Sequence, residues 1–339
     1  MAYWEPSMSS EIQHPYERLT PDRVMDAVES QGYLCDARNL ALNSYENRVY
    51  QVGIEDDTPI IAKFYRPERW SKDQILEEHS FSLELQEMEF PIVAPMQNEH
   101  QETLHEFEGF QFALFKRMGG YPPELDNLDH LLILGRCMGR LHKLGSAEPF
   151  QHRPEISLQR YGTDNAVWLL ENDFIPSALI EAYETLTRDV LDRLSKIEAS
   201  YNPELIRVHG DAHVGNILWR DDNPHFVDFD DTCMAPAIQD LWMFLNGDRA
   251  SQTIQLAELL EGYEEFHEFN PIELNLVEYY RTLRLMNYSG WLAKRWTDPA
   301  FPMAFTWFNT ERYWSEHILE LREQLANLDE PPLSVYGNL

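Results

Sequence analysis

The segment His209-Gly210-Asp211-Ala212-His213-Val214-Gly215-Asn216, followed soon after by Phe226-Val227-Asp228-Phe229-Asp230-Asp231, is the most informative part of the chain. Short apolar runs at 205–208 and 217–219 flank the first segment, and a turn at 222–224 leads into a third run at 225–227. Such runs, bounded by turn residues, have the length and content of short strands. The pattern therefore predicts a loop held between strands, with Asp211, Asn216 and Asp228 close to the strand ends.

Asp211 and Asn216 have the spacing of the H-R-D-x-x-x-x-N pattern, in which the Asp accepts a hydroxyl proton and the Asn binds Mg²⁺. Asp228 follows a strand, as the Asp of D-F-G does, and Mg²⁺ prefers hard oxygen ligands. We therefore predict phosphoryl transfer from ATP, with Asp211 and Asp228 as catalytic residues and Asn216 and Asp228 as Mg²⁺ ligands. The alternative is that Asp211 caps a turn and that the later aspartates form a solvated acidic run.

The composition is typical of an enzyme with two lobes and substantial cores, because 43% of the 339 residues are apolar. The longest apolar stretches are far shorter than a membrane-spanning helix, and residues 1–10 lack the features of a signal peptide, so we expect a cytoplasmic protein. Cys35, Cys137 and Cys233 are odd in number and widely spaced. They argue against a disulfide framework or structural zinc and are expected to be buried thiols.

The charge is strongly negative, with 58 acidic and 27 basic residues and a formal net charge of −31. Such a field repels nucleic acid and anionic membranes, which excludes both as expected partners. It leaves two interpretations open: a preference for a basic substrate, or an acidic surface unrelated to the substrate.

The N-terminal part predicts a small sheet with helices. Thr20-Pro21-Asp22 is expected to begin a helix that ends at Gly32, residues 40–52 predict a hairpin, and 59–65 predict a strand that contains Lys63. Kinases hold the ATP phosphates with such a lysine and orient it with a glutamate on the following helix. On the helix predicted for 71–86, Glu78 shares a face with apolar residues and is the preferred partner over Glu77.

The polar middle of the hairpin, Asn43-Ser44-Tyr45-Glu46-Asn47, is expected to cover the ATP phosphates, although it has no glycine and could be an ordinary turn. Backbone N–H groups and the Ser44 hydroxyl would make the contacts, with Asn47 beside them. Residues 110–115 predict a buried strand that leads into a hinge at 116–120. We expect the adenine beside Phe115 and Met118, an N-terminal lobe at 1–118, and a C-terminal lobe at 119–339.

The C-terminal part predicts mostly helices, at 127–144, within an insertion at 149–203, at 237–245 and across 254–323. His142 is expected to be a packed core histidine. Asp240 can reach back to the backbone of the catalytic loop, but it is equally well explained as a carboxylate favoured at a helix N-terminus.

Together these residues resemble the aminoglycoside phosphotransferase and choline kinase superfamily, in which H-G-D replaces H-R-D and I-D-x-x-D replaces D-F-G. The matching positions are His209-Gly210-Asp211, Asn216, Asp228 and Asp231, and Asp231 is expected to support the site structurally. Longer blocks at 42–50, 63–70, 209–221 and 239–243 resemble one bacterial branch, the stress response kinases.

This resemblance implies an α+β, bilobal protein-kinase-like fold, with an antiparallel sheet and a helix in the N-terminal lobe and a larger helical lobe after it. It also implies a cytoplasmic serine/threonine protein kinase that uses ATP and Mg²⁺, phosphorylates itself and acts in stress response and cell survival, with Ser44 in the ATP site. We expect a monomer. The alternatives are a kinase for an amino or quaternary alcohol and, from another class, a nucleotide-binding pseudokinase that acts as a scaffold.

Overall fold

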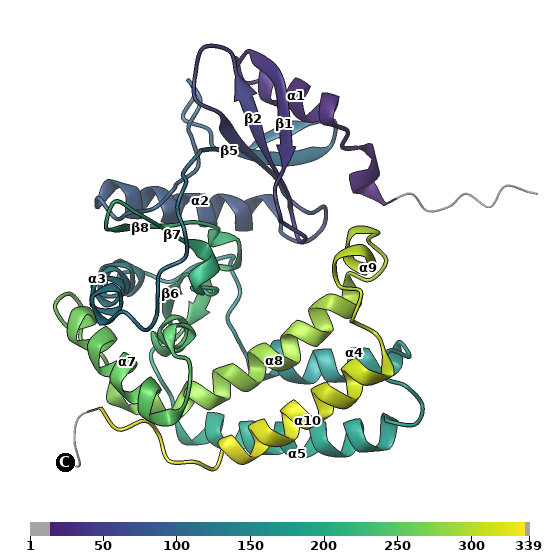
Figure 1. Ribbon diagram of the computed structural model, residues 1–339, viewed down its shortest axis with the longest axis vertical. Coiled ribbons are helices and arrows are strands. Elements are labelled where there is room, and N and C mark those ends of the chain that lie inside the picture. Colours follow the sequence, from purple (N-terminus) through teal and green to yellow (C-terminus); the bar gives the residue numbers. More distant parts are fainter. Residues whose placement is uncertain (1–13, 336–339) are drawn as a thin grey trace, which may run out of the picture.

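The computed structural model describes residues 14–335, which form a smaller lobe built on a sheet and a larger lobe built of helices (Figure 1). The sheet is antiparallel with strand order β1-β2-β3-β5-β4. Its strands are β1 Cys35–Ala41, β2 Arg48–Ile54, β3 Ile60–Phe64, β4 His105–Phe107 and β5 Phe110–Lys116. This arrangement confirms the predicted α+β, two-lobed fold.

Helices α1 (Pro21–Glu29) and α2 (Lys72–Glu87) accompany the sheet, and both begin where the local sequence supplies a cap. The Thr20 hydroxyl accepts from the backbone N–H of Arg23 in α1, while Ser71 and Gln74 form a reciprocal capping box in α2. Helix α2 therefore has a defined start, which determines which of its residues face β3.

The first hairpin is longer than predicted, because β1 begins at Cys35 rather than near residue 40. Cys35 pairs with Ile54, and the register then shifts before Asn39, with Ala37 in the left-handed region at φ 67°. A bulge of this kind interrupts the alternation of polar and apolar residues on which strand prediction depends. The loop between β1 and β2, residues 42–47, is where the sequence predicted it.

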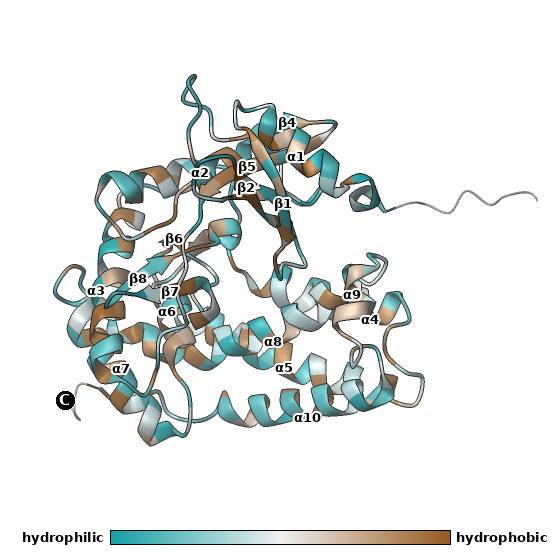
Figure 2. Cartoon of the chain, turned by 45° about the horizontal axis from the view of Figure 1, so that its top comes forward, coloured by the Kyte–Doolittle hydropathy of each residue, from teal (hydrophilic) through white to brown (hydrophobic). Residues whose placement is uncertain are grey.

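The helical lobe contains a single large core and five long helices with several short ones. The long helices are α3 Leu128–Gly145, α5 Ile180–Ser200, α7 Arg249–Tyr263, α8 Val277–Lys294 and α10 Glu311–Asn327, and the short ones are α4 Asp164–Glu171, α6 Ile238–Leu241 and α9 Ala300–Ala304. Helices α3 and α7 approach backbone to backbone, since a Cβ on Gly135 would collide with the carbonyl of Leu259 and one on Gly262 with that of Leu132. Hydrophobic residues line the inner faces of these helices (Figure 2).

Four short strands surround the segment 209–216. Strand β6 (Ile206–Val208) pairs with β9 (Cys233–Ala235), and β7 (Ile217–Arg220) pairs with β8 (Asn223–Phe226). The turn lies at Asp221 and Asp222, both at positive φ, so β8 begins where the sequence predicted a turn. Strands β4 and β9 were not predicted, because each has only three residues and, unlike β6, neither borders the segment 209–216 that drew attention to its flanks.

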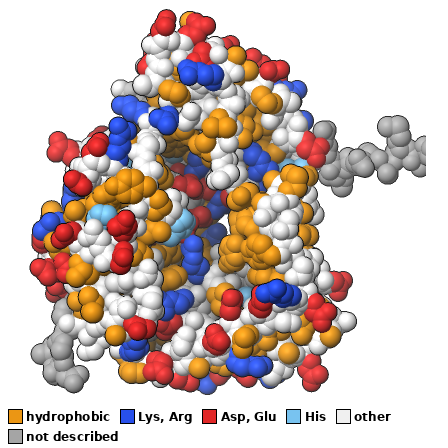
Figure 3. Space-filling view, viewed as in Figure 1, with side chains coloured by type: hydrophobic (Ala, Val, Ile, Leu, Met, Phe, Trp, Pro, Cys, Tyr) orange, Lys and Arg blue, Asp and Glu red, His pale blue; other side chains and the backbone are white. Residues whose placement is uncertain are grey.

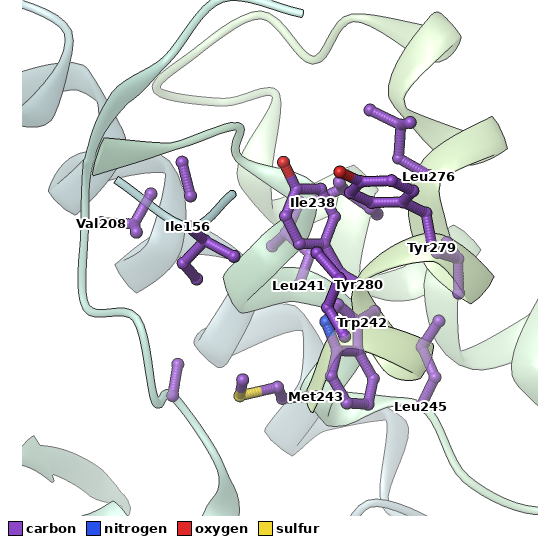
Figure 4. Packing of buried hydrophobic residues seen from close by; sticks show 14 of the residues in the cluster. Ile156, Val208, Ile238, Leu241, Trp242, Met243, Leu245, Leu276, Tyr279 and Tyr280 are labelled. Atoms are coloured by element: carbon purple, nitrogen blue, oxygen red, sulfur yellow. The ribbon is translucent and has the colours of Figure 1, made fainter. Parts of the chain in front are cut away.

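The prediction of one helix over 237–245 is wrong in its length. Helix α6 ends at Leu241, and Trp242–Phe244 continue as a 3₁₀ helix in which the N–H of Leu245 donates to Trp242. Both pieces are buried against α8, where Ile238, Trp242 and Tyr280 pack together (Figure 4). This packing holds α6 beneath the segment 209–216.

Two smaller points concern the cysteines and the helices. Cys137 and Cys233 are buried free thiols as expected, whereas Cys35 is partly exposed, because it lies on an edge strand of the sheet. Among the helices of residues 14–335, none is long and apolar enough to cross a membrane.

Candidate active site

A cavity of about 1010 Å³ lies between the two lobes and opens on the face seen in Figure 3. We describe it by three surfaces. The N-terminal wall is formed by its lining residues within 42–118, the floor by those within 210–239, and the helical wall by those within 156–165 and 280–295. All but one of the site residues predicted from the sequence line this cavity, namely Ser44, Asn47, Lys63, Glu78, Phe115, Met118, Asp211, Asn216, Asp228 and Asp231. The exception is Asp240, which is buried behind the floor.

The floor carries the segment 209–216, and Asp240 holds its backbone. The two carboxylate oxygens of Asp240 accept from the N–H groups of His209 (2.8 Å) and Gly210 (2.9 Å). His142 lies 3.0 Å from the same carboxylate and 3.0 Å from the Tyr263 hydroxyl, and it is completely buried. The core histidine and the loop-binding aspartate thus belong to one hydrogen-bonded group.

His209 connects the segment 209–216 with the segment 226–231. Sequence reasoning did not identify this connection. Its Nε2 lies 3.0 Å from the carbonyl of Val227, and its Nδ1 accepts from the N–H of Asp211 at 3.3 Å. Gly210, at φ 82°, brings the backbone so close to the Asp231 carbonyl that a Cβ could not fit. These contacts align Asp211 with Asp228.

The Asp211 carboxylate forms polar contacts with three residues, and one of them is the Asn216 amide, which donates to it at 3.4 Å. The carboxylate also lies 2.5 Å from the Arg284 guanidinium and 3.4 Å from His213 Nε2. Burial raises the pKa of Asp211, but the hydrogen bond from His213 and the charge of Arg284 outweigh it and hold this pKa well below its ordinary value. Arg284 was missed because it lies 73 residues beyond Asp211, on α8, without a local motif.

Asn216 and Asp228 offer oxygen atoms to the cavity. The amide nitrogen of Asn216 donates to the Asp211 carbonyl (3.0 Å), which leaves the amide oxygen as an acceptor for a cation. Asp228 has a left-handed backbone, φ 59°, and its carboxylate is half exposed to the cavity. Within residues 14–335, no three His, Cys, Asp or Glu side chains are grouped as a metal site of their own. Two hard ligands completed by substrate phosphates fit Mg²⁺, which is rarely enclosed by protein alone.

Lys63 is 5% exposed and lies among three carboxylates. Its Nζ is 2.9 Å from Asp228, 3.3 Å from Asp230 and 3.8 Å from Glu78. Burial lowers the pKa of Lys63, but these carboxylates outweigh burial and raise it well above its ordinary value. Burial raises the pKa of Glu78 to about 7, against the effect of Lys63.

Glu77 faces away from this cluster. Its carboxylate accepts from the backbone N–H groups of Gln151, His152 (2.8 Å) and Arg153 (2.7 Å). Of the two adjacent glutamates, Glu78 is therefore the one that faces Lys63, because the phase of α2 turns it toward β3.

Arg69 and Asp230 complete the cluster, and sequence reasoning missed both as site residues. Arg69 forms ion pairs with Asp230 and with Asp231 (2.5 Å). Asp230 is buried, and although burial raises its pKa, Arg69 and Lys63 hold it below the ordinary value. No local pattern could identify Arg69, since it reaches the floor from the loop between β3 and α2.

The loop 42–47 closes the N-terminal wall. Ser44 lines the cavity, but the Asn47 side chain is buried and accepts from the N–H of Arg66 at 3.0 Å, so it also holds the loop. Glu46 reaches the opposite wall, where it pairs with Arg295 at 3.0 Å and accepts from the indole of Trp291. The loop thus bridges the cavity.

Comparison with known proteins agrees with this geometry. Residues 39–274, more than half of the chain, match the family described as "Phosphotransferase enzyme family". The chain belongs to this family. This phosphotransferase is 45% identical over 322 residues to "Stress response kinase A" of Escherichia coli (strain K12), covering 94% of this chain and 97% of that protein. It is also 45% identical over 326 residues to "Serine/threonine protein kinase RdoA" of Salmonella typhimurium, with the same coverage.

Solved structures of low sequence identity share the fold of this phosphotransferase. The amicoumacin kinase hAmiN, in complex with AMP-PNP, Ca²⁺ and Ami, gives a TM-score of 0.72 at 19% identity and covers 95% of this chain and 98% of its own. A microcompartment-associated aminopropanol kinase gives a TM-score of 0.67 at 16% identity, over 91% and 99% of the two chains. The phosphotransferase fold therefore extends across nearly the whole chain.

Proposed function

We propose that this phosphotransferase is an ATP-dependent serine/threonine protein kinase that also phosphorylates itself. The observation that carries the proposal is the convergence of Asp211, Asn216, Asp228 and Lys63 on one cavity. The similarity to a stress response kinase and to a serine/threonine protein kinase, each over 94% of the chain, supports the protein acceptor. By the same similarity, we propose a cytoplasmic monomer that acts in stress response and cell survival.

In the proposed mechanism, Asp211 orients the acceptor hydroxyl and accepts its proton as the γ-phosphoryl group is transferred. Lys63, held among Glu78 and its neighbours, balances the charge of the phosphates. Mg²⁺, when bound by Asn216 and Asp228, would neutralise negative charge on the β- and γ-phosphates. Asp240 is a positioning residue, because it acts through the backbone of the loop that carries Asp211.

The ATP itself is proposed to lie along the N-terminal wall. Phe115 and Met118 would contact the adenine at the end of β5, and the loop 42–47 would cover the phosphates with Ser44. We propose that backbone N–H groups of the loop contribute without a glycine, because Asn47 holds the conformation of the hairpin. Asp231 would support the floor through Arg69.

The proposal is tested by incubating the protein with γ-labelled ATP and Mg²⁺, alone, with a general protein substrate, and with choline or ethanolamine. We expect label on the protein itself and on the protein substrate, and none with Asp211→Asn. Transfer to the alcohols alone would replace the protein acceptor by an amino or quaternary alcohol. Nucleotide binding without any transfer would favour a pseudokinase scaffold and contradict the proposal.

A further inference from the structure

The helical wall carries an excess of positive charge in a chain of net charge −31. Its lining residues include four cations, Arg160, Arg284, Lys294 and Arg295, and no Asp or Glu lines the cavity from 156–165 or 280–295. Lys and Arg side chains are visible in the hollow between the lobes (Figure 3). The sign of this wall is therefore opposite to that of the molecule as a whole.

Two of these cations have no ionic partner among residues 14–335. Arg295 pairs with Glu46 and Arg284 with Asp211, but neither Arg160 nor Lys294 lies within ion-pair distance of a carboxylate of residues 14–335. The Nζ of Lys294 donates instead to the amide oxygen of Asn165 at 2.7 Å. Arg160 lies over the ring of Trp70.

The unpaired cations also lie close enough to affect one another. Burial is the main cause that lowers the pKa of Lys294. The charge of Asp164 opposes it, and the charges of Arg295 and Arg160 lower this pKa by smaller amounts. Like charges held together in a partly buried wall repel each other, and an anion between them would relieve that repulsion.

The same arrangement disfavours a cationic acceptor. Tyr288 and Trp291 line the helical wall and could stack on an ammonium group, but the two unpaired cations of this wall, Arg160 and Lys294, would repel it. The charge of the wall therefore separates this site from one suited to an amino or quaternary alcohol.

Arg284 connects this charge to the reacting group. Its side chain is 42% exposed, and its guanidinium occupies Asp211 Oδ1. A carboxylate beside the acceptor hydroxyl gives Arg284 a second partner, so that Asp211 Oδ1 becomes available to the hydroxyl. The wall would thus bind an acidic acceptor and open the catalytic carboxylate to it.

We propose that the helical wall selects a serine or threonine flanked by acidic residues, and that Arg160 and Lys294 bind the flanking carboxylates. This inference rests on the proposed protein kinase function and adds the charge of its acceptor. It also resolves the two interpretations of the acidic composition, because a basic acceptor is the one that this wall repels.

The test uses three peptides that share one serine and differ only in flanking residues, which are Glu, Gln or Lys. We expect kcat/KM of the full-length protein to be about tenfold higher for the Glu peptide than for the Gln peptide, and lowest for the Lys peptide. The preference should weaken as salt increases, because the unpaired cations are partly exposed. In Arg160→Gln/Lys294→Gln the Glu-over-Gln ratio should fall to about one, mainly through KM.

Arg136→Gln is the matched control, since Arg136 is an exposed cation of α3 that pairs with Glu265 and does not line the cavity. It should leave the ratio unchanged. A wild-type preference for the Gln or Lys peptide would overturn the inference while the protein kinase function stands. An unchanged ratio in the double variant with a normal KM for ATP would overturn it too. Failure of every peptide while choline is phosphorylated would instead contradict the proposed function.

Discussion

The N-terminal wall and the helical wall face each other across one cavity, but their cations differ in burial and in ion pairing. Lys63 and Arg69 reach the floor from the N-terminal wall and are largely buried. They form ion pairs with five carboxylates, namely Glu46, Glu78, Asp228, Asp230 and Asp231. On the helical wall, Arg160 and Lys294 are partly exposed and have no carboxylate partner among the described residues.

The difference follows from solvation. A charge that is taken out of water must be compensated within the protein, whereas one that remains partly hydrated can stay unpaired. The buried cations of the N-terminal wall, Lys63 and Arg69, are therefore paired before a ligand arrives, and the helical wall keeps charge available for one.

Asp211, which lies between the two walls, should show the largest effect. We expect Asp211→Asn to lower kcat by at least about 10³-fold, because the hydroxyl loses its proton acceptor, while ATP binding measured by calorimetry changes little. Asp221→Asn, in the exposed turn between β7 and β8, is the control and should keep normal turnover. Loss of ATP binding in Asp211→Asn would contradict this expectation, because Asp211 would then act in ATP binding, as the N-terminal wall is proposed to do.

Removing one lysine from each wall tests the contrast directly. Lys63→Met leaves buried carboxylates without compensation and should lower the free energy of unfolding by about 3–5 kcal/mol. Lys294→Met removes an unpaired, partly exposed charge and should change it by less than about 1 kcal/mol. Urea unfolding monitored by circular dichroism would measure both changes in the free energy of unfolding. Equal losses would contradict the distinction between the walls.

Asp298 joins the edges of the two lobes and should have an intermediate effect. It is 1% exposed and accepts from Arg48 (2.9 Å) and Arg66 (2.7 Å), which lie in and just after the strands of the N-terminal sheet. We expect Asp298→Asn to cost about 2–3 kcal/mol in urea unfolding, since the partly buried Arg48 loses its counter-charge and the buried Arg66 keeps only Glu46. Asp329→Asn, which breaks an exposed pair with Arg193, should cost less than about 0.5 kcal/mol.

Glu273 is a buried carboxylate, and no Lys or Arg of residues 14–335 forms an ion pair with it. It extends the comparison of paired and unpaired charges to an acidic group. Burial raises its pKa to about 7, although its carboxylate accepts from the N–H of Ile238. The protonated form is therefore favoured in the folded state, and this contribution to stability is lost as the pH rises toward and through 7. Glu273→Gln should be more stable than the wild type at pH 8, by on the order of 1–3 kcal/mol, and equal to it near pH 4. Thermal unfolding at both pH values measures this, and a difference independent of pH would argue against the raised pKa.

Much of the floor and the N-terminal wall could be predicted from local sequence. The strands around 209–216, the strand with Lys63 and the phase of the helix with Glu78 depend on short-range spacing, which the fold preserves. Asp240 was recognised as able to reach the loop backbone, and the structure adds His142 and Tyr263 behind it. The lengths of β1 and α6 could not be predicted, because a bulge and a change to 3₁₀ geometry leave no clear periodic signal.

The helical wall was not predictable in the same way. Arg284 and Lys294 look like ordinary surface cations of an amphipathic helix in the sequence, and only the packing of α8 beneath the cavity brings them to Asp211 and Asn165. The pairs of Glu46 with Arg295 and of Arg66 with Asp298 likewise join residues more than two hundred positions apart.

The amino-acid sequence alone was sufficient to predict that this protein is a phosphotransferase, because the residues that we propose for the transfer lie within short segments of regular spacing. The charge of the acceptor side was decided by the tertiary structure. Net charge is a sum over the whole chain, whereas the charge of a wall depends on which few side chains the folding of distant helices brings together.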